Sequence, residues 1–472
     1  MSLVAPVAIV PVAELGRVHM VGIGGAGMSG IARVLLARGV AVSGSDAREV
    51  PLLAELRGLG ARTFVGHAAA NLADLGPSDT LVVSTAIRAD NAELVAARER
   101  GMRVLPRAAA LGSLMDGRRG VAVAGTHGKT TTSSMLTVAA QHADARPGYV
   151  IGGQIVTTGI GADDGAGELF VAEADESDGS FLMLGPFGAI VTNVEADHLD
   201  NYSGLDEILA GFAAFVDSIR PGGFLVACTD DAHAAGLAAR GRERGLTVLT
   251  YGTAPSADVR VTGVATRGLG TAFTIDGMGA YTLAVPGKHN ALNAAAVVAA
   301  GRVLGLDAGA VRDGLAAFGG AARRFEPKGE AGGVAVFDSY AHHPTELTAD
   351  LDAARDLAGD RGGRVIAVFQ PHLYSRTRFF ADEFGAALGL ADHAVVLDVY
   401  AAREDPEPGV TGATIADRVP GGRVTYQPDR DAVPATVAGL ARPGDVVLTM
   451  GAGDITQLGP VIVGALGREP GA

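Results

Sequence analysis

Short apolar runs separated by longer amphipathic stretches recur along the chain. Near its start, runs at 18–21, 40–43 and 81–84 are typical of buried strands, and the stretches 31–38 and 52–59 favour helices. Strands that alternate with helices form parallel sheets, because a parallel crossover usually contains a helix. The pattern therefore predicts a doubly wound α/β unit at the start of the chain.

The same alternation returns after breaks at 116–120 and near 323–325. We therefore expect three α/β domains, at residues 1–119, 120–321 and 322–472. In the second and third domains, the expected strands lie at 120–124, 169–172, 189–192, 224–227, 334–338, 365–369, 394–397 and 446–450, and an alanine-rich helix lies at 291–304.

Composition narrows the class of protein. The chain has 472 residues, of which 48% are hydrophobic and 19% charged, which is typical of a folded globular protein. Its net charge of −14 excludes a general affinity for nucleic acid, since such binding draws on released counterions. The only cysteine, Cys228, excludes an intramolecular disulfide framework.

The sequence also gives an expectation about location. No run reaches the roughly 18–20 apolar residues that a membrane helix needs. The N-terminus lacks a basic stretch, and Pro6 and Pro11 interrupt its apolar patches, so we do not expect a signal peptide. We expect a cytoplasmic protein without a membrane partner.

A glycine loop with a Lys-Thr pair joins the strand-like run 120–124 to a helix-like run at 133–140. In such a loop, backbone N–H groups surround a phosphate, the lysine adds a positive charge, and the next hydroxyl can hold Mg²⁺. The standard pattern has a glycine where Val123 stands, so this loop is a shorter variant. We expect a nucleoside triphosphate to bind its residues, Gly125, Thr126, His127, Gly128, Lys129, Thr130 and Thr131.

A second glycine loop lies in the first domain. Residues 22–27 fit the pattern G-x-G-x-x-G between a strand and a helix, and Asp46 follows the next strand. This is the pattern of a dinucleotide site, but its physical basis is shared by any ligand with a diphosphate, including a UDP-sugar. From the residues alone, NAD(P), another diphosphate ligand and a tight turn all stay open.

Polar clusters follow several predicted strands. In the second domain, the acidic stretch 173–178 and the cluster 193–198 each leave a strand, where Glu173 and His198 could bind cations. Asn290 opens the alanine-rich helix, where it could act as a cap. A solvated acidic turn and a structural histidine are the plainer interpretations of the first two clusters.

Two further loops of the third domain are rich in His, Tyr and Arg. Tyr340 and His342 follow one strand, and Arg376 and Arg378 follow another. Open α/β sheets bind ligands at the carboxyl ends of their strands, and arginine suits carboxylates and phosphates. We therefore expect this edge of the third domain to contact substrate.

Taken together and in this order, the clusters resemble the Mur ligase family, from Gly22–Gly30 to Gly451–Asp454. The resemblance implies a Rossmann-like N-terminal domain for a UDP-sugar, a central P-loop ATPase-like domain, and a Rossmann-like C-terminal domain. The last would bind the amino acid and help to close on ATP. The implied reaction joins L-alanine to the carboxylate of UDP-N-acetylmuramate through an acyl phosphate, in peptidoglycan precursor synthesis.

The resemblance also implies residue roles. ATP would contact the Lys-Thr loop and Asn290, and Mg²⁺ would be held by Thr130, Glu173 and His198. Lys129, His198, His342 and Arg376 would serve catalysis. The substrate would meet Gly24, Gly25, Gly27, Met28, Ser29, Asp46, Tyr340 and Arg378. The implied assembly is a monomer or a weak homodimer.

Two positions depart from the family pattern, because Leu373 replaces a common arginine and Ser339 a common aspartate. The segment 195–215 also lacks the lysine that related ligases carbamylate. Three alternatives stay open: a relative that attaches a recycled peptide to the same sugar nucleotide, an NAD-dependent oxidoreductase with a fused kinase-like unit, and a non-catalytic nucleotide switch.

Overall fold

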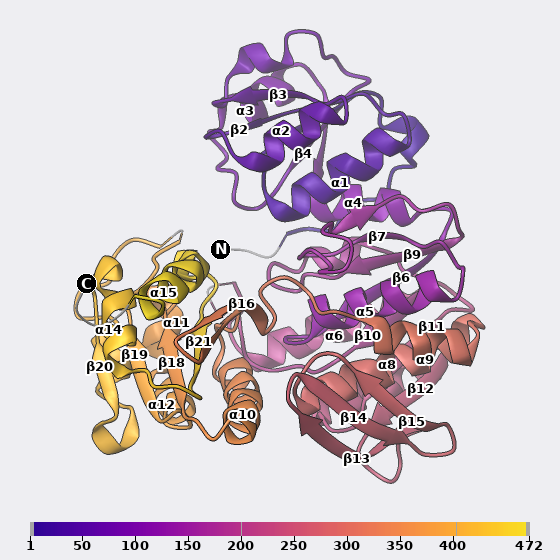
Figure 1. Cartoon of the computed structure of the whole chain (residues 1–472). Helices are drawn as coiled ribbons and strands as arrows, with labels where there is room; N and C mark the ends of the chain where they lie inside the picture. Colours follow the sequence, from indigo (N-terminus) through magenta and orange to yellow (C-terminus); the bar gives the residue numbers. More distant parts are fainter. Residues whose placement is uncertain (1–3, 200, 403, 469–472) are drawn as a thin grey trace. The chain divides into compact units, whose positions relative to one another are not determined.

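A computed structural model of the protein describes residues 4–199, 201–402 and 404–468. The chain packs as two units. The first comprises the chain up to Val261 together with Asn293–Leu315, and the second comprises Thr262–Leu292 and the chain from Ala316 onward. Figure 1 labels most elements of both units.

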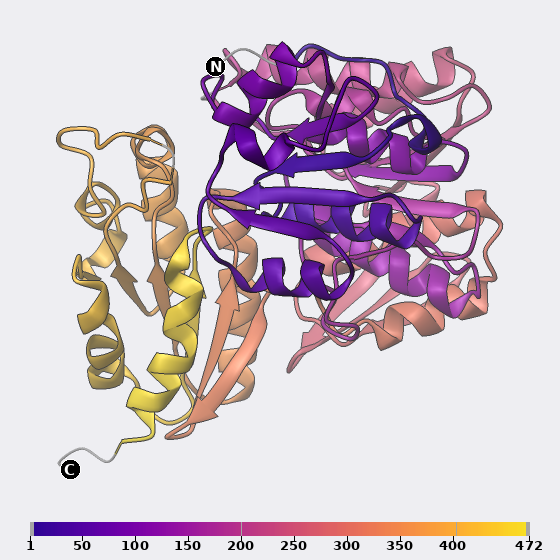
Figure 2. The ribbon, with the colours of Figure 1, turned by 90° about the horizontal axis from the view of Figure 1, so that it is seen from above.

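The first unit begins with a parallel sheet of five strands in the order β3-β2-β1-β4-β5, which lie side by side in Figure 2. The strand order reverses beside β1, so its carboxyl end is the switch point at which such sheets bind ligands. The elements are β1 (Val18–Val21), α1 (Ala26–Ala37), β2 (Val42–Asp46), α2 (Pro51–Gly58), β3 (Arg62–Val65), β4 (Thr80–Val83), α3 (Ala92–Glu99), β5 (Arg103–Pro106) and α4 (Arg107–Met115).

The boundaries of several elements differ from the prediction, and two of the differences lie beside the first glycine loop. The strand expected at 40–43 lies at Val42–Asp46, because Gly39 adopts a left-handed φ of 79° and the chain extends only after this turn. The helix expected from residue 31 begins at Ala26, inside the glycine pattern. Gly27 is therefore a helical residue and not part of the loop.

A second sheet in the first unit is centred on β6, with the order β13-β12-β11-β10-β6-β9-β7-β8. The strands β6, β9 and β10 are parallel, so their carboxyl ends share one edge. The elements are β6 (Arg119–Ala124), α5 (Lys129–His142), β7 (Gly148–Val150), β8 (Ala162–Asp163), β9 (Leu169–Glu173), β10 (Gly188–Val191), α6 (Leu205–Asp217), β11 (Phe224–Cys228), α7 (Ala232–Glu243), β12 (Thr247–Gly252), β13 (Val259–Arg267), α8 (Lys288–Leu304) and α9 (Ala308–Ala317).

The second unit contains an antiparallel hairpin, β14 (Gly270–Ile275) and β15 (Gly279–Leu283), and a sheet of six strands in the order β16-β17-β21-β18-β19-β20. Only the pairing of β16 with β17 is antiparallel in this sheet. Its elements are β16 (Glu326–Ala331), β17 (Val334–Ser339), α10 (Pro344–Asp360), β18 (Val365–Phe369), α11 (Tyr374–Phe379), α12 (Ala381–Leu388), β19 (His393–Val396), α13 (Ala413–Ala416), β20 (Val424–Tyr426), α14 (Val433–Leu440), β21 (Val446–Met450) and α15 (Leu458–Leu466).

Local sequence explains several of these elements. β18 is apolar throughout, β21 is apolar except for Thr449, and both are buried, as expected for central parallel strands covered on both faces. Asn91 caps α3 by accepting hydrogen bonds from the backbone of Glu93 and Leu94, and Pro51 begins α2. No helix within the described ranges is long and apolar enough to cross a membrane.

Candidate functional site

The Lys-Thr loop joins β6 to α5 through two glycines in left-handed conformations, with a φ of 135° at Gly125 and 84° at Gly128. A Cβ at Gly125 would lie 2.0 Å from the hydroxyl oxygen of Thr192, so only glycine fits there. Val123 is a fully buried residue of β6. The loop is short because the strand continues through the position at which the standard pattern has its first glycine.

The end of β10 holds the loop in place. The backbone N–H of Thr126 donates to the Asn193 carbonyl (3.0 Å), and that of His127 donates to the Asn193 side chain (2.8 Å). Asn193 therefore orders the loop. The first intrahelical bond of α5 runs from Thr132 N to Gly128 O, so the N–H groups of residues 128–131 can receive an anion.

Lys129 folds back over this loop. Its ammonium donates to the carbonyls of Gly125 (2.6 Å) and Thr126 (3.1 Å) and to the Glu176 carboxylate (2.8 Å). Burial alone would lower the pKa of Lys129, but the negative charges of Glu176, Asp175 and Glu173 hold that pKa above its ordinary value. The side chain therefore stays positively charged in the protein without nucleotide.

The proposed magnesium ligands of the loop and of β9 lie together. The Thr130 hydroxyl donates to Glu173 (3.0 Å), whose other oxygen accepts the backbone N–H of Gly152 (2.7 Å). The Nε2 atom of His198 lies 3.6 Å from Glu176. The structure thus gathers the sequence-predicted residues around one edge of the sheet.

Glu176 was missed by the sequence analysis as an individual residue. Its side chain is buried, and its Oε2 atom has no hydrogen-bond partner among the described residues. A buried carboxylate oxygen without a donor suits a cation or a water that a cation carries. The acidic stretch 173–178 pointed to this turn, but only the fold distinguishes the buried carboxylate of Glu176 from its partly exposed neighbours.

The first glycine loop has the same layout without a lysine. The N–H groups of Gly22 and Ile23 donate to the Ser45 carbonyl (2.8 and 3.0 Å), and that of Gly24 donates to the Asp46 carboxylate (3.1 Å). A Cβ at Gly24 would lie 2.8 Å from that carboxylate. Asp46 therefore shapes the loop from the end of β2.

Three other predicted substrate residues lie at the start of α1. Gly25 precedes the helix as its N-cap, the Met28 side chain is buried, and the Ser29 hydroxyl donates to the Ala26 carbonyl (3.0 Å). The α1 N-terminus thus offers a ligand its backbone N–H groups, as the glycine pattern predicts for a diphosphate.

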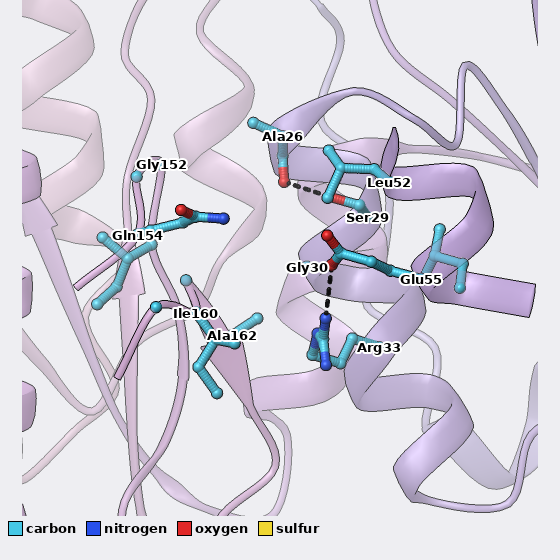
Figure 3. A pocket seen from close by; sticks show the side chains of 15 residues that line it. Ala26, Ser29, Gly30, Arg33, Leu52, Glu55, Gly152, Gln154, Ile160 and Ala162 are labelled. Atoms are coloured by element: carbon cyan, nitrogen blue, oxygen red, sulfur yellow. Dashed lines mark hydrogen bonds and ion pairs between the residues drawn. The ribbon is translucent and has the colours of Figure 1, made fainter. Parts of the chain in front are cut away.

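A cavity of about 90 Å³ lies beside α1 (Figure 3). One wall comes from α1 and α2, where Arg33 pairs with Glu55 at 3.3 Å. The opposite wall comes from residues 151–154 and 159–162. Because Gly152 in that wall donates to Glu173, the cavity wall is connected to the candidate metal site.

In the second unit, the predicted His and Arg loops meet at the carboxyl edge of the sheet. The Nδ1 atom of His342 lies 2.9 Å from the Tyr340 carbonyl and 3.3 Å from the Glu346 carboxylate. The rings of His342 and His372 lie 6.1 Å apart, and the buried Arg376 contacts His372 at 3.4 Å. These groups form a cluster able to bind an anion or accept a proton.

The remaining predicted site residues have mixed outcomes. The Arg378 side chain is 60% exposed and pairs with Glu407, so it lies at the rim of the cluster. Asn290 does not cap α8, because the helix begins at Lys288; its amide donates to the Pro286 carbonyl (2.6 Å). Leu373, one of the departures from the family pattern, is buried with a left-handed φ of 72°.

Ser339, the other departure, hydrogen-bonds to Asp350, a carboxylate that the sequence analysis did not single out. Burial raises the pKa of Asp350 to about 6, although the Ser339 hydrogen bond opposes this rise. Asp350 lies in the middle of α10, where its spacing resembles that of any exposed acidic residue. Its environment is therefore a product of the tertiary fold.

Comparison with known proteins decides the family. The model described as "Mur ligase family, catalytic domain" matches residues 17–119, "Mur ligase middle domain" matches 123–301, and "Mur ligase, glutamate ligase domain" matches 323–453. The chain belongs to the Mur ligase family. The predicted family and the α/β fold with three domains are confirmed, and the enzyme is an ATP-dependent ligase.

Relatives match over nearly their full length. A UDP-N-acetylmuramate–L-alanine ligase of Thermobifida fusca is 61% identical, with 99% of this chain and 100% of the relative covered. One of Kineococcus radiotolerans is 59% identical, with 97% and 98% covered. The oxidoreductase alternative is set aside, because a Mur ligase needs no hydride-transfer cofactor at its first glycine loop.

Solved structures of ligases with related names have a similar fold over nearly the whole chain. The UDP-N-acetylmuramate-alanine ligase of Thermotoga maritima is 28% identical, with a TM-score of 0.78 over 95% of this chain and 98% of that one. A murein peptide ligase of Psychrobacter arcticus is 25% identical, with a TM-score of 0.69 over 97% and 100%.

Proposed function

We propose that this protein joins L-alanine to the carboxylate of UDP-N-acetylmuramate, with ATP converting that carboxylate into an acyl phosphate, in peptidoglycan precursor synthesis. The observation that carries the proposal is the 61% identity, over the full length, to a relative with that name. The Lys-Thr loop supports it, because a phosphoryl transfer needs a lysine and carboxylates beside the transferred group.

We assign the Lys-Thr loop and Asn290 to ATP. Lys129 would exchange its contacts with loop carbonyls and Glu176 for the phosphates. Thr130, Glu173 and His198 would hold Mg²⁺, and the partnerless oxygen of the buried Glu176 fits this assignment. When bound, Mg²⁺ would neutralise charge on the transferring phosphoryl group.

We assign the first glycine loop to the diphosphate of the UDP-sugar. The α1 N-terminus offers backbone N–H groups there, and Asp46 holds Gly24 in position. Gly25, Gly27, Met28 and Ser29 complete this proposed substrate segment.

The remaining chemistry is assigned to the cluster of the second unit. After the carboxylate oxygen has attacked the γ-phosphorus and ADP has left, the alanine amine attacks the acyl carbon and inorganic phosphate departs. The amine loses a proton in this step, and we propose that His342 accepts it, with its ring held through Nδ1. Arg376, with Tyr340 and Arg378 nearby, would hold the anionic substrate groups.

Phosphate release tests the proposal. With ATP, Mg²⁺ and UDP-N-acetylmuramate, the purified protein is expected to release phosphate when L-alanine is added and to form one UDP-N-acetylmuramoyl-L-alanine per phosphate. The matched reaction contains the tripeptide L-alanyl-γ-D-glutamyl-meso-diaminopimelate instead. Turnover with the tripeptide alone would identify a recycling ligase, and no turnover with either would overturn both assignments.

Two further assignments follow from the proposed substrates. ATP and UDP-sugars are cytoplasmic metabolites, so we propose that the enzyme acts in the cytoplasm. We propose a monomer or weak homodimer, which sedimentation at several concentrations would test.

A further inference from the structure

Arg107 borders the first glycine loop and also the acidic turn beside the second. It begins α4 directly after Pro106 ends β5, at the carboxyl edge of the first sheet. Its Nη1 atom lies 2.9 Å from the position that a Cβ would take at Gly27. Its Nη2 atom donates to Asp175 at 2.9 Å. The glycine of the fingerprint thus leaves room for a guanidinium in the first turn of α1.

Asp175 belongs electrostatically to the Lys-Thr site. It follows Glu173 in the turn after β9, and its other oxygen accepts the backbone N–H of Ser177 (3.1 Å). Burial would raise the pKa of Asp175, but Arg107, the Ser177 hydrogen bond and the positive charges of Lys129 and His198 bring that pKa well below its ordinary value. Its negative charge is therefore shared between Arg107 and the groups around Lys129.

The guanidinium geometry permits a bridge. Arginine presents its N–H groups in a planar fork that suits carboxylates and phosphates alike. One arm of Arg107 is used on Asp175, while Nη1 makes no hydrogen bond with the residues that the structure describes. That second arm lies beside the α1 N-terminus, where a diphosphate would gain from both the helix end and a fixed cation.

We propose that Arg107 is a positioning residue that couples the two nucleotide sites, with Nη1 holding a diphosphate oxygen of the UDP-sugar while Nη2 keeps its bond to Asp175. This inference rests on the proposed function. The bound UDP-sugar then orders the turn that carries Glu173 and Glu176, and ATP bound there orders Arg107 in return. Each ligand consequently binds more tightly in the presence of the other, by the same factor.

Calorimetry tests the coupling. The Kd of UDP-N-acetylmuramate is measured with and without a non-hydrolysable ATP analogue and Mg²⁺, and the wild-type protein is expected to bind about fivefold to tenfold more tightly with the analogue. In Arg107→Ala, the Kd without analogue should rise about tenfold, and the coupling factor should fall to about one. The Kd of the analogue alone should stay unchanged, which a general loss of structure would not give.

Further variants keep the test decisive if Arg107→Ala folds poorly. Arg107→Lys keeps the charge but lacks the fork, so it should recover part of the affinity and none of the coupling. Asp175→Asn should lose most of the coupling with a smaller loss of UDP-sugar affinity. Arg62→Ala, which removes an exposed pair with Asp74 in the same domain, should match the wild type.

The outcomes separate this inference from the proposed function. Wild-type protein that ligates L-alanine but shows no coupling overturns the inference alone. The inference is also overturned if Arg107→Ala binds both ligands with wild-type affinity and coupling. If Arg107→Ala folds poorly, the same result in Arg107→Lys and Asp175→Asn overturns it. Wild-type protein that neither binds UDP-N-acetylmuramate nor ligates overturns the proposed function instead.

Discussion

The two glycine loops of the first unit share a backbone layout and differ in charge. Each joins a buried parallel strand to a helix N-terminus, β1 to α1 and β6 to α5. In the first loop a carboxylate, Asp46, accepts a loop N–H, whereas in the second a lysine donates to the loop carbonyls. Glycines therefore shape a backbone for any phosphate, and the charged side chains decide whether that phosphate is only bound or is transferred.

Removing the lysine should have the largest effect. Lys129→Ala is expected to lower kcat about a thousandfold, because a fixed positive charge on the transferred phosphoryl group is lost. The Kd of UDP-N-acetylmuramate without ATP should stay unchanged, since Lys129 is not part of the first glycine loop, to which we assign that ligand. Steady-state phosphate release and calorimetry measure the two quantities. Lys328→Ala, which removes a lysine paired with Glu326, is the matched control.

The carboxylate beside the second loop should matter next. Glu173→Gln is expected to raise the Mg²⁺ concentration for half-maximal activity about tenfold to a hundredfold, because the amide is a poor cation ligand. Magnesium titrations of the ligation rate check this. Glu168→Gln, at an exposed position just before the same strand, should titrate like the wild type. An unchanged titration in Glu173→Gln would remove Glu173 from the metal site.

At the first loop, the carboxylate should act only as an acceptor. Asp46→Ala is expected to raise the KM for UDP-N-acetylmuramate about tenfold, because Gly24 loses its hydrogen bond. Asp46→Asn should restore most of this loss, since an amide oxygen also accepts. The KM for ATP should stay constant in both. Equal damage by Ala and Asn would mean that the negative charge itself is needed.

The smallest effect concerns stability and pH. The pKa of Asp175 in the folded protein lies below its ordinary value, so its contribution is present above that ordinary value and is lost as the pH falls through the folded pKa. Asp175→Asn is expected to lower the free energy of unfolding by about 1 kcal/mol at pH 7. The effect is this small because the ion pair of Asp175 with Arg107 is partly exposed and solvent screens it. Urea titrations should give the same difference at pH 7 and at about pH 5, and a smaller one at about pH 2.5, below the ordinary pKa of an aspartate.

Sequence reasoning predicted the central strands that are continuous apolar runs, and it missed other strands, among them the parallel strands β3, β5, β12 and β20. The run 365–369 coincides with β18 because a strand buried on both faces is a continuous apolar stretch. The hairpin of β14 and β15 was missed, because the expected strands were continuous apolar runs, whereas the residues of this hairpin alternate between buried and exposed. Pairing with a neighbour, which no single stretch encodes, makes them strands.

The residues of the candidate site also divide into those that the sequence could predict and those that it could not. Thr130 and Glu173 could be proposed together because the carboxyl ends of parallel strands meet at one edge, and they lie in contact. Arg107 and Asp350 could not be proposed as site residues from the sequence, because nothing in the local sequence distinguishes an arginine after a proline or an aspartate in a helix from others of their kind. Their surroundings are set by the tertiary fold, which places Arg107 against Gly27 and Asp350 against Ser339.

The bond between Lys129 and Glu176 bears on the protein before any nucleotide arrives. A buried ammonium without a partner would be strongly destabilising, and Glu176 supplies the negative charge that compensates Lys129. In the proposed complex, ATP would replace Glu176 as the anionic partner of Lys129, so the affinity for ATP would be a difference between two ion pairs. The Glu176 carboxylate released in that exchange would then be available to the proposed Mg²⁺.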